Sequence, residues 1–214
     1  MEQTPGKRPD RYDVSGSVEA EYVDADRTVL VNKRGVTELA TLQHLEEEAL
    51  AAAYRTLLSE ARLDTPMSCE LVRHIHRRIF SDLYAWAGRW RSVWISKPGI
   101  TWSAPDFIDQ NMNAWQRDVL GKYPAVALGQ DSAFCGAVAE IQGEFLVIHP
   151  FREGNARTIK LLTDLLATQT DRRPLVYDRT DEGKKRYIAA AEAAFRKDYV
   201  PLLQVIRQAL EQAR

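Results

Sequence analysis

Residues 149 to 160 read HPFREGNARTIK and combine a histidine, a carboxylate, a Gly-Asn pair and two cations in one short run. These residue types could together transfer part of a nucleoside triphosphate. An imidazole has an ordinary pKa of about 6.5, so His149 could accept a proton from a hydroxyl at neutral pH. Arg157 could hold a phosphate through two parallel hydrogen bonds, and Lys160 would add a second positive charge on the same face of a helix.

This chemistry requires a tight turn between two helices. Apolar residues recur every three or four positions in the segment 132–148, which predicts an amphipathic helix there. Pro150 disfavours the helical conformation of the residue before it, so this helix should end at His149. A second helix should begin near Asn155 or Ala156, where its leucine periodicity starts.

The start of the second helix offers an anion site. Its first N–H groups have no partner inside the helix, and the helix dipole favours negative charge near them. Gly154 would let the backbone approach a ligand closely. Glu153 could ligate Mg²⁺, which prefers a few carboxylates together with phosphate oxygens and water. The alternative is a polar turn with a Glu153–Arg157 ion pair and no ligand.

The rest of the chain predicts an all-α fold. A flexible N-terminal arm is expected over residues 1–27, followed by one domain over 28–214. The stretch 88–105 instead alternates in polarity and contains a Pro-Gly turn, which predicts a small β-hairpin that forms a flap. The other predicted helices cover about 37–57, 67–84, 106–120, 181–197 and 199–212.

Four tryptophans lie in or near the expected flap, namely Trp86, Trp90, Trp94 and Trp102. They could stack on a nucleotide base or pack the flap onto the helices. Packing is the better interpretation, because aromatic side chains most often serve cores.

The composition excludes several classes of protein. The 214 residues carry a net charge of −1 and are 45% hydrophobic, which suits one globular domain and argues against direct nucleic-acid binding or a membrane-surface protein. Cys69 and Cys135 lack metal-site spacing, so we expect free thiols in a reducing cytoplasm. His74 and His76 fall on different helix faces and are expected to be surface or partly buried residues rather than metal ligands.

The segment 149–160 resembles the signature of Fic (filamentation induced by cAMP) proteins, H-x-F-x-D/E-G-N-G-R-x-x-R. The positions that match are His149, Phe151, Glu153, Gly154, Asn155 and Arg157. Ala156 replaces a glycine, and Lys160 replaces the final arginine. Upstream, a YxWAGxxR run resembles the segment that leads into the flap of these proteins, with its last position shifted by one; it lies at Tyr84, Trp86, Ala87, Gly88 and Arg91.

The resemblance covers about residues 30–210 and implies a Fic-type helical bundle that acts as a protein adenylyltransferase. Such an enzyme transfers AMP from ATP, with Mg²⁺, to a Ser, Thr or Tyr hydroxyl of a target protein. His149 would be the general base and Glu153 the magnesium ligand, in an active-site loop over 149–157. The phosphates would be bound by Gly154, Asn155, Ala156, Arg157 and Lys160. A flap over about 90–104 would dock the target as an added strand, through Val93, Trp94, Ile95, Ser96 and Lys97.

The two departures from the signature leave alternatives open. If position 156 requires a positive φ, its Cβ costs about 1 kcal/mol or more, whereas alanine is harmless if the position is helical. Lys160 keeps the charge of arginine but lacks its two-pronged hydrogen-bond geometry. The alternative function is therefore a Fic-fold protein with altered transfer chemistry, or one that only binds a nucleotide or a partner.

Many Fic proteins are inhibited by a helix with the pattern S/T-x-x-x-E-G/N. Ser15 and Glu19 match its first and fifth positions, but Ala20 stands at the last. Any inhibitor is therefore expected to be a separate small antitoxin-like chain, as in a toxin–antitoxin pair. The expected location is the cytoplasm, or the cytosol of another cell after delivery.

Overall fold

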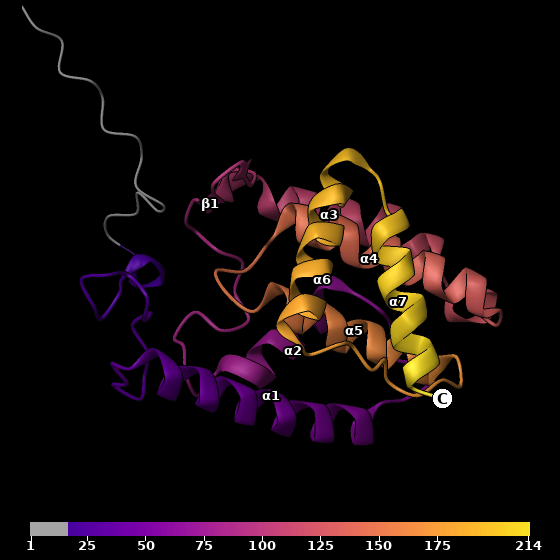
Figure 1. The fold of residues 1–214 in the computed structure, drawn as a ribbon, viewed down its shortest axis with the longest axis horizontal. Coiled ribbons are helices and arrows are strands. Elements are labelled where there is room, and N and C mark those ends of the chain that lie inside the picture. Colours follow the sequence, from indigo (N-terminus) through magenta and orange to yellow (C-terminus); the bar gives the residue numbers. More distant parts are fainter. Residues whose placement is uncertain (1–16) are drawn as a thin grey trace, which may run out of the picture.

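The computed structural model describes residues 17–214, which form a bundle of seven α-helices with one small antiparallel hairpin (Figure 1). The strands are Ser96–Lys97 (β1) and Ile100–Thr101 (β2). The helices are Leu39–Glu60 (α1), Cys69–Phe80 (α2), Ile108–Asp118 (α3), Asp131–Ile148 (α4), Asn155–Gln169 (α5), Asp181–Ala193 (α6) and Val200–Gln212 (α7). The predicted fold class, all-α with a small β-hairpin flap, is confirmed.

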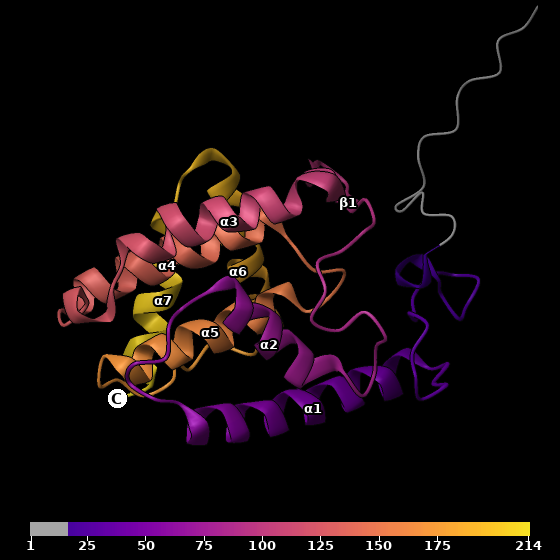
Figure 2. The same ribbon diagram turned by 180° about the vertical axis from the view of Figure 1, so that it is seen from behind.

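Helix α4 forms the centre of the bundle. It packs against α3, α5, α6 and α7, while α1 lies along one edge of the molecule on α2 and α5 (Figures 1 and 2). Phe134, Val138 and Phe145 of α4 are fully buried. A helix that is apolar around most of its circumference must be covered on most sides, which explains the central place of α4.

Two short polar residues fix the starts of helices in the way their side chains favour. Ser68 accepts a hydrogen bond from the backbone N–H of Leu71 at the start of α2, at 3.1 Å. Thr180 accepts one from the backbone N–H of Gly183 at the start of α6, also at 3.1 Å. Each bond satisfies an N–H group that has no partner inside its helix.

The flap is attached to the helices at its base and its tip. The indole N–H of Trp102 donates to the carbonyl of Leu146 at 3.0 Å, and Lys97 forms an ion pair of 2.6 Å with Glu192 of α6. The expected packing role holds for Trp86 and Trp102, which are buried, whereas Trp94 is 51% exposed. These contacts attach the flap to α4 and α6, and one aromatic side chain of the flap is exposed.

The described residues before α1 lie at the same end of the molecule as the hairpin, away from the C terminus (Figures 1 and 2). Tyr22 and Leu30 form an isolated antiparallel bridge that folds this segment back on itself. Residues 1–16 of the predicted arm lie outside the described residues, so its extent stays a prediction.

Two further features concern the chain as a whole. Both cysteines carry free thiols, in agreement with their spacing. No helix within residues 17–214 has the length and apolar character needed to cross a bilayer.

Candidate active site

His149 ends α4 in a left-handed conformation, with φ 53° and ψ 61°, and its N–H donates to the carbonyl of Phe145 at 2.8 Å. The predicted end of the helix is confirmed. The conformation differs from the extended one that a following proline favours. Contacts from Arg91 hold this turn, because its Nε donates to the carbonyl of His149 and its backbone N–H to that of Pro150, both at 2.8 Å.

The imidazole of His149 is arranged as a proton acceptor. Its Nδ1 lies 3.3 Å from the carbonyl oxygen of Leu146, and its ring packs on Trp102 with the centroids 4.4 Å apart. A carbonyl can only accept, so Nδ1 carries the hydrogen and Nε2 keeps its lone pair. Burial lowers the pKa of His149 to about 4, so the ring is neutral at pH 7. No residue from 17 to 214 occupies Nε2 with a hydrogen bond.

The loop after His149 is closed by Asn155. The side-chain oxygen of Asn155 accepts the N–H of Phe151, and its amide nitrogen donates to the carbonyl of the same residue, both at 2.8 Å. Gly154 takes a positive φ of 79°, and a Cβ there would lie 2.2 Å from the ring of Phe80. A glycine is therefore required at 154, and Asn155 acts on the loop itself because it is only 2% exposed.

The start of α5 presents free backbone N–H groups. The first helical hydrogen bond runs from Thr158 to the carbonyl of Gly154, at 2.9 Å. The N–H groups before it have no acceptor within residues 17–214; they belong to Asn155, Ala156 and Arg157. Ala156 is a helical residue without positive φ, so the alanine is accommodated without strain. This geometry suits an anion.

Arg157 is held by two carboxylates rather than pointing freely from the helix. Its Nη1 donates to Oε2 of Glu46 in α1 at 2.8 Å, and its Nη2 to Oε1 of Glu153 at 3.3 Å. Burial lowers the pKa of Arg157, but these carboxylates outweigh it and raise that pKa overall. A phosphate at Arg157 would therefore compete with Glu46, whose other oxygen accepts the hydroxyl of Tyr84 at 2.5 Å.

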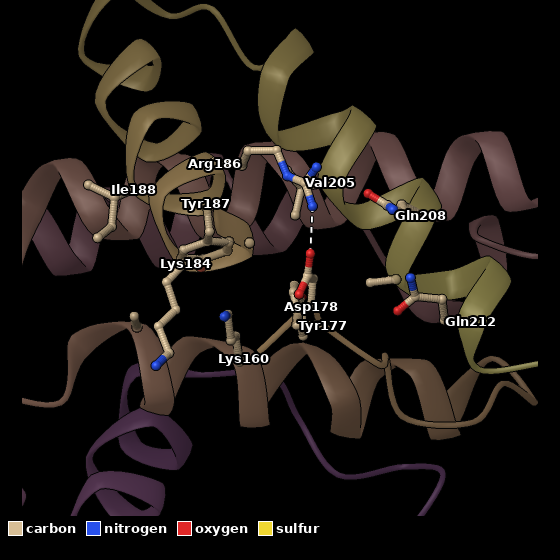
Figure 3. Close-up of a pocket in the computed structure, with 13 residues that line it drawn as sticks. Lys160, Tyr177, Asp178, Lys184, Arg186, Tyr187, Ile188, Val205, Gln208 and Gln212 are labelled. Carbon is tan, nitrogen blue, oxygen red and sulfur yellow. Dashed lines mark hydrogen bonds and ion pairs between the residues drawn. The ribbon is translucent and has the colours of Figure 1, made fainter. Parts of the chain in front are cut away.

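Lys160 lines a cavity of about 250 Å³ between α5, α6 and α7 (Figure 3), and Arg157 is not among the residues that line it. Its Nζ lies 4.1 Å and 3.8 Å from the ring centroids of Tyr177 and Tyr187. Burial lowers the pKa of Lys160 to about 8. The structure thus separates the two cations that the helical spacing placed on one face, although Ala156 lines the same cavity as Lys160.

Glu153 lies two residues before the first free N–H group of α5, which belongs to Asn155. Its Oε1 accepts the N–H of Gly154 at 2.8 Å, its side chain is 46% exposed, and no described residue binds Oε2. Within residues 17–214, no three His, Cys, Asp or Glu side chains group as a metal site. One free carboxylate oxygen beside an anion site still fits Mg²⁺, which takes its other ligands from phosphate and water.

The predicted docking residues of the flap differ in their exposure to solvent. Val93 and Ile95 are buried, at 0% and 4% exposed, whereas Trp94 is 51% exposed. Ser96 pairs with Thr101 across the hairpin. Of the five residues predicted to dock a target, Trp94 is therefore the one with the most exposed side chain.

His76 was predicted to be a surface or partly buried residue, and this is wrong because it is fully buried. Its Nδ1 accepts the N–H of Gly88 at 2.8 Å, so its Nε2–H donates to the carbonyl of Glu153 at 3.0 Å. Burial lowers its pKa to about 3. Val72 and Ile79, at helical spacing on either side, were the signal that His76 faces the core.

Glu19, which matched part of the inhibitory pattern, does not contact Arg157. Its carboxylate accepts the N–H of Ser92 at the base of the flap, at 2.8 Å. Its own carbonyl accepts Nε of Arg152 from the active-site loop, also at 2.8 Å. Ser15 of the same pattern lies outside the described residues. Glu19 thus joins the N-terminal segment to the flap and the loop.

The chain is similar in sequence and in fold to proteins with Fic domains. Residues 66–167 match the model of the Fic/DOC family. A probable protein adenylyltransferase, y4lH of Sinorhizobium fredii, is 28% identical over 84% of this chain and 90% of its own length. Other relatives named protein adenylyltransferases are longer, and the chain spans as little as 29% of them.

Solved structures show the same fold. The N-terminal FIC domain of Bep8 from Bartonella sp. 1-1C superposes with a TM-score of 0.71 at 20% identity, over 88% of this chain and 94% of that one. BepC from Bartonella tribocorum, solved with bound AMPPNP, gives a TM-score of 0.71 at 17% identity, over 88% and 95% of the two chains.

Proposed function

We propose that the protein transfers AMP from ATP to a Ser, Thr or Tyr hydroxyl of another protein. The observation that carries this proposal is the placement of His149, whose Nδ1 lies 3.3 Å from the carbonyl oxygen of Leu146, which leaves Nε2 as the nitrogen that can accept a proton. Burial lowers the pKa of His149 to about 4, which keeps the ring neutral at pH 7. The names of the relatives as protein adenylyltransferases support the same reaction.

In this reaction, Nε2 of His149 accepts the proton of the target hydroxyl as its oxygen attacks the α-phosphorus. A bond forms between that oxygen and phosphorus, the bond to the bridging oxygen of the β-phosphate breaks, and pyrophosphate leaves. The N–H groups of Asn155, Ala156 and Arg157 would stabilise the negative charge that develops on the phosphate oxygens.

The residues present also fit the expected cofactor. Glu153 would hold Mg²⁺ through its free oxygen, and the ion would neutralise phosphate charge when bound. The rest of the site binds and orients: the backbone N–H groups hold the phosphates, and the flap presents the target. An inhibitor on a separate chain stays a prediction.

A second candidate function is nucleotide binding with weak or altered transfer. The placement of Arg157 and Lys160 favours it, because one lies between carboxylates and the other between tyrosine rings. Neither cation is therefore free to orient the terminal phosphates without a rearrangement. Transfer of another part of the nucleotide would then compete with AMP transfer.

Incubation of the protein with a bacterial lysate and each of the four triphosphates, labelled at the α-phosphate, tests the proposal. We expect label from ATP on protein, and its loss in His149→Ala. His44→Ala is the matched control, since His44 is exposed and pairs only with Glu48. Nucleotide binding with no label from any triphosphate would contradict transfer and support the second candidate.

A further inference from the structure

Arg91 joins three separate points around the active site through one buried guanidinium. The residue is 2% exposed. Its Nη1 donates to the carbonyl of Val93 at 2.7 Å and its Nη2 to that of Ser103 at 2.8 Å. Its Nε donates to the carbonyl of His149 at 2.8 Å. Val93 lies before the first strand of the flap and Ser103 after the second, so one side chain holds both ends of the flap against the turn at His149 and Pro150.

The turn that Arg91 holds is a strained one. His149 has a left-handed backbone, which costs a residue with a side chain about 1–2 kcal/mol and persists only where its surroundings enforce it. Arg91 binds this turn twice, by Nε at His149 and by its backbone N–H at Pro150. These two hydrogen bonds hold the backbone from which the imidazole projects, while Leu146 and Trp102 contact the ring itself.

The guanidinium donates only to neutral carbonyls, so its charge needs compensation from elsewhere. Burial lowers the pKa of Arg91 to about 10, and the negative charge of Glu19 acts against this effect. The residue therefore stays charged at neutral pH. Glu19 is itself 7% exposed and accepts the N–H of Ser92, the residue next to Arg91. The N-terminal segment thus supplies the counter-ion of Arg91.

We propose that Arg91, with Glu19 as its counter-ion, is a positioning residue that keeps the flap in register with His149. The inference rests on the proposed function, in which the flap presents a hydroxyl to Nε2. A target strand placed on the hairpin brings its hydroxyl to the imidazole only if both ends of the flap stay at a constant distance from the turn at His149. A displacement of about 1 Å between reacting groups can cost about a hundredfold in rate.

The first test follows backbone exchange by hydrogen–deuterium exchange in wild type, Arg91→Met and Arg91→Lys. Arg89→Met is the matched control, because Arg89 is exposed and its side chain donates only to the carbonyl of Ala85. In Arg91→Met we expect exchange about tenfold faster in both peptides, 92–104 and 149–154, with α4 and α5 unchanged. Arg91→Lys should be intermediate and Arg89→Met unchanged.

Two results would overturn the proposal. Faster exchange in the flap alone would show that Arg91 only anchors the flap, and equal acceleration throughout the bundle would show a general role in stability. Where Arg91→Met does not fold, Glu19→Gln replaces it, since this variant removes the counter-charge and leaves the guanidinium in place. It should loosen the same two peptides.

The second test compares transfer with nucleotide binding. Arg91→Met should lower the rate of label transfer to lysate proteins about a hundredfold, while the Kd for Mg-ATP, measured by calorimetry, stays within about threefold of wild type. Arg91→Lys should recover part of the rate. Equal losses in binding and transfer would contradict a positioning role. If wild type transfers no label, the proposed function fails, but the exchange measurement still decides the role of Arg91.

Discussion

Glu46 and Arg157 connect α1 to α5 through an ion pair in which Oε2 of Glu46 lies 2.8 Å from Nη1 of Arg157. The pair is largely shielded from water, with the two side chains 10% and 26% exposed. Arg157 lies in the first turn of α5, among the residues whose backbone N–H groups are free. If Arg157 binds a phosphate as proposed, the affinity for a triphosphate should depend on how easily Glu46 releases Arg157.

Replacing Glu46 by Gln should strengthen nucleotide binding. The amide is uncharged, so Arg157 would exchange it for a phosphate at lower cost, and we expect a Kd for Mg-ATP lower by about tenfold. Isothermal titration calorimetry measures this directly. Glu47→Gln, on the exposed side of the same helix, should have no effect. Weaker binding in Glu46→Gln would mean instead that Glu46 holds Arg157 in the orientation that phosphate needs.

The pH dependence of transfer should report the buried state of His149. A general base acts only when neutral, and burial lowers the pKa of His149 from 6.5 to about 4. The value of kcat/KM, which reflects the free enzyme, should therefore stay constant as the pH falls from about 7 to about 5.5 and decrease only toward about 4. Circular dichroism at each pH would show that the fold persists. An acid limb near 6.5 would contradict the burial of the imidazole.

His76 should make the stability of the protein depend on pH. Its pKa is about 3 when folded and about 6.5 when unfolded, so the unfolded chain binds the proton first. This contribution to stability is complete above pH 6.5 and is lost as the pH falls, by about 2 kcal/mol at about pH 5. Urea unfolding measures the free energy of unfolding at about pH 7.5 and at about pH 5. The difference between these two free energies should be smaller in His76→Gln than in wild type by this amount.

The control for this measurement is His44→Gln, since His44 is exposed on α1. It should leave the difference between the two pH values unchanged. A His76→Gln variant that keeps the whole pH dependence would assign the effect to other groups, because His76 would then not be the buried neutral imidazole that holds Gly88 and Glu153.

The sequence predicted the helices around the site well because their signals are local. The apolar periodicity of 132–148 and Pro150 placed the end of α4 at His149, and α5 begins at Asn155 as expected. The Pro-Gly pair located the hairpin in the same way. Each of these features depends on residues within a few positions of one another, which a single sequence displays directly.

The contacts that shape the site could not be predicted, because they join distant parts of the chain. Arg157 and Glu46 are 111 positions apart, and Arg91 and His149 are 58 apart. The types of these residues were visible, but a single sequence does not say which charge meets which carbonyl or carboxylate. The orientation of Lys160 could not be predicted for the same reason. Its spacing from Arg157 allowed both side chains to share one helix face, but packing against distant residues separates the two side chains.

Gly154 is the residue of the loop that should tolerate a side chain least. A Cβ at its positive φ would lie 2.2 Å from the buried ring of Phe80, so either the backbone or the ring must move. The left-handed conformation costs about 1–2 kcal/mol and the overlap about 1–3 kcal/mol more. Gly154→Ala should therefore lower the Tm by roughly 10 °C, as measured by calorimetry.

Two matched substitutions separate this effect from a general response to glycine and alanine. Gly136→Ala in α4 meets no atom within 4 Å and should raise stability by up to about 1 kcal/mol. Ala156→Gly should lower it by about 1 kcal/mol, because position 156 is helical and glycine is a poor helix former. If Gly154→Ala were as stable as wild type, the loop would have another conformation open to it. The free N–H groups of α5 would then not be held in the arrangement on which phosphate binding depends.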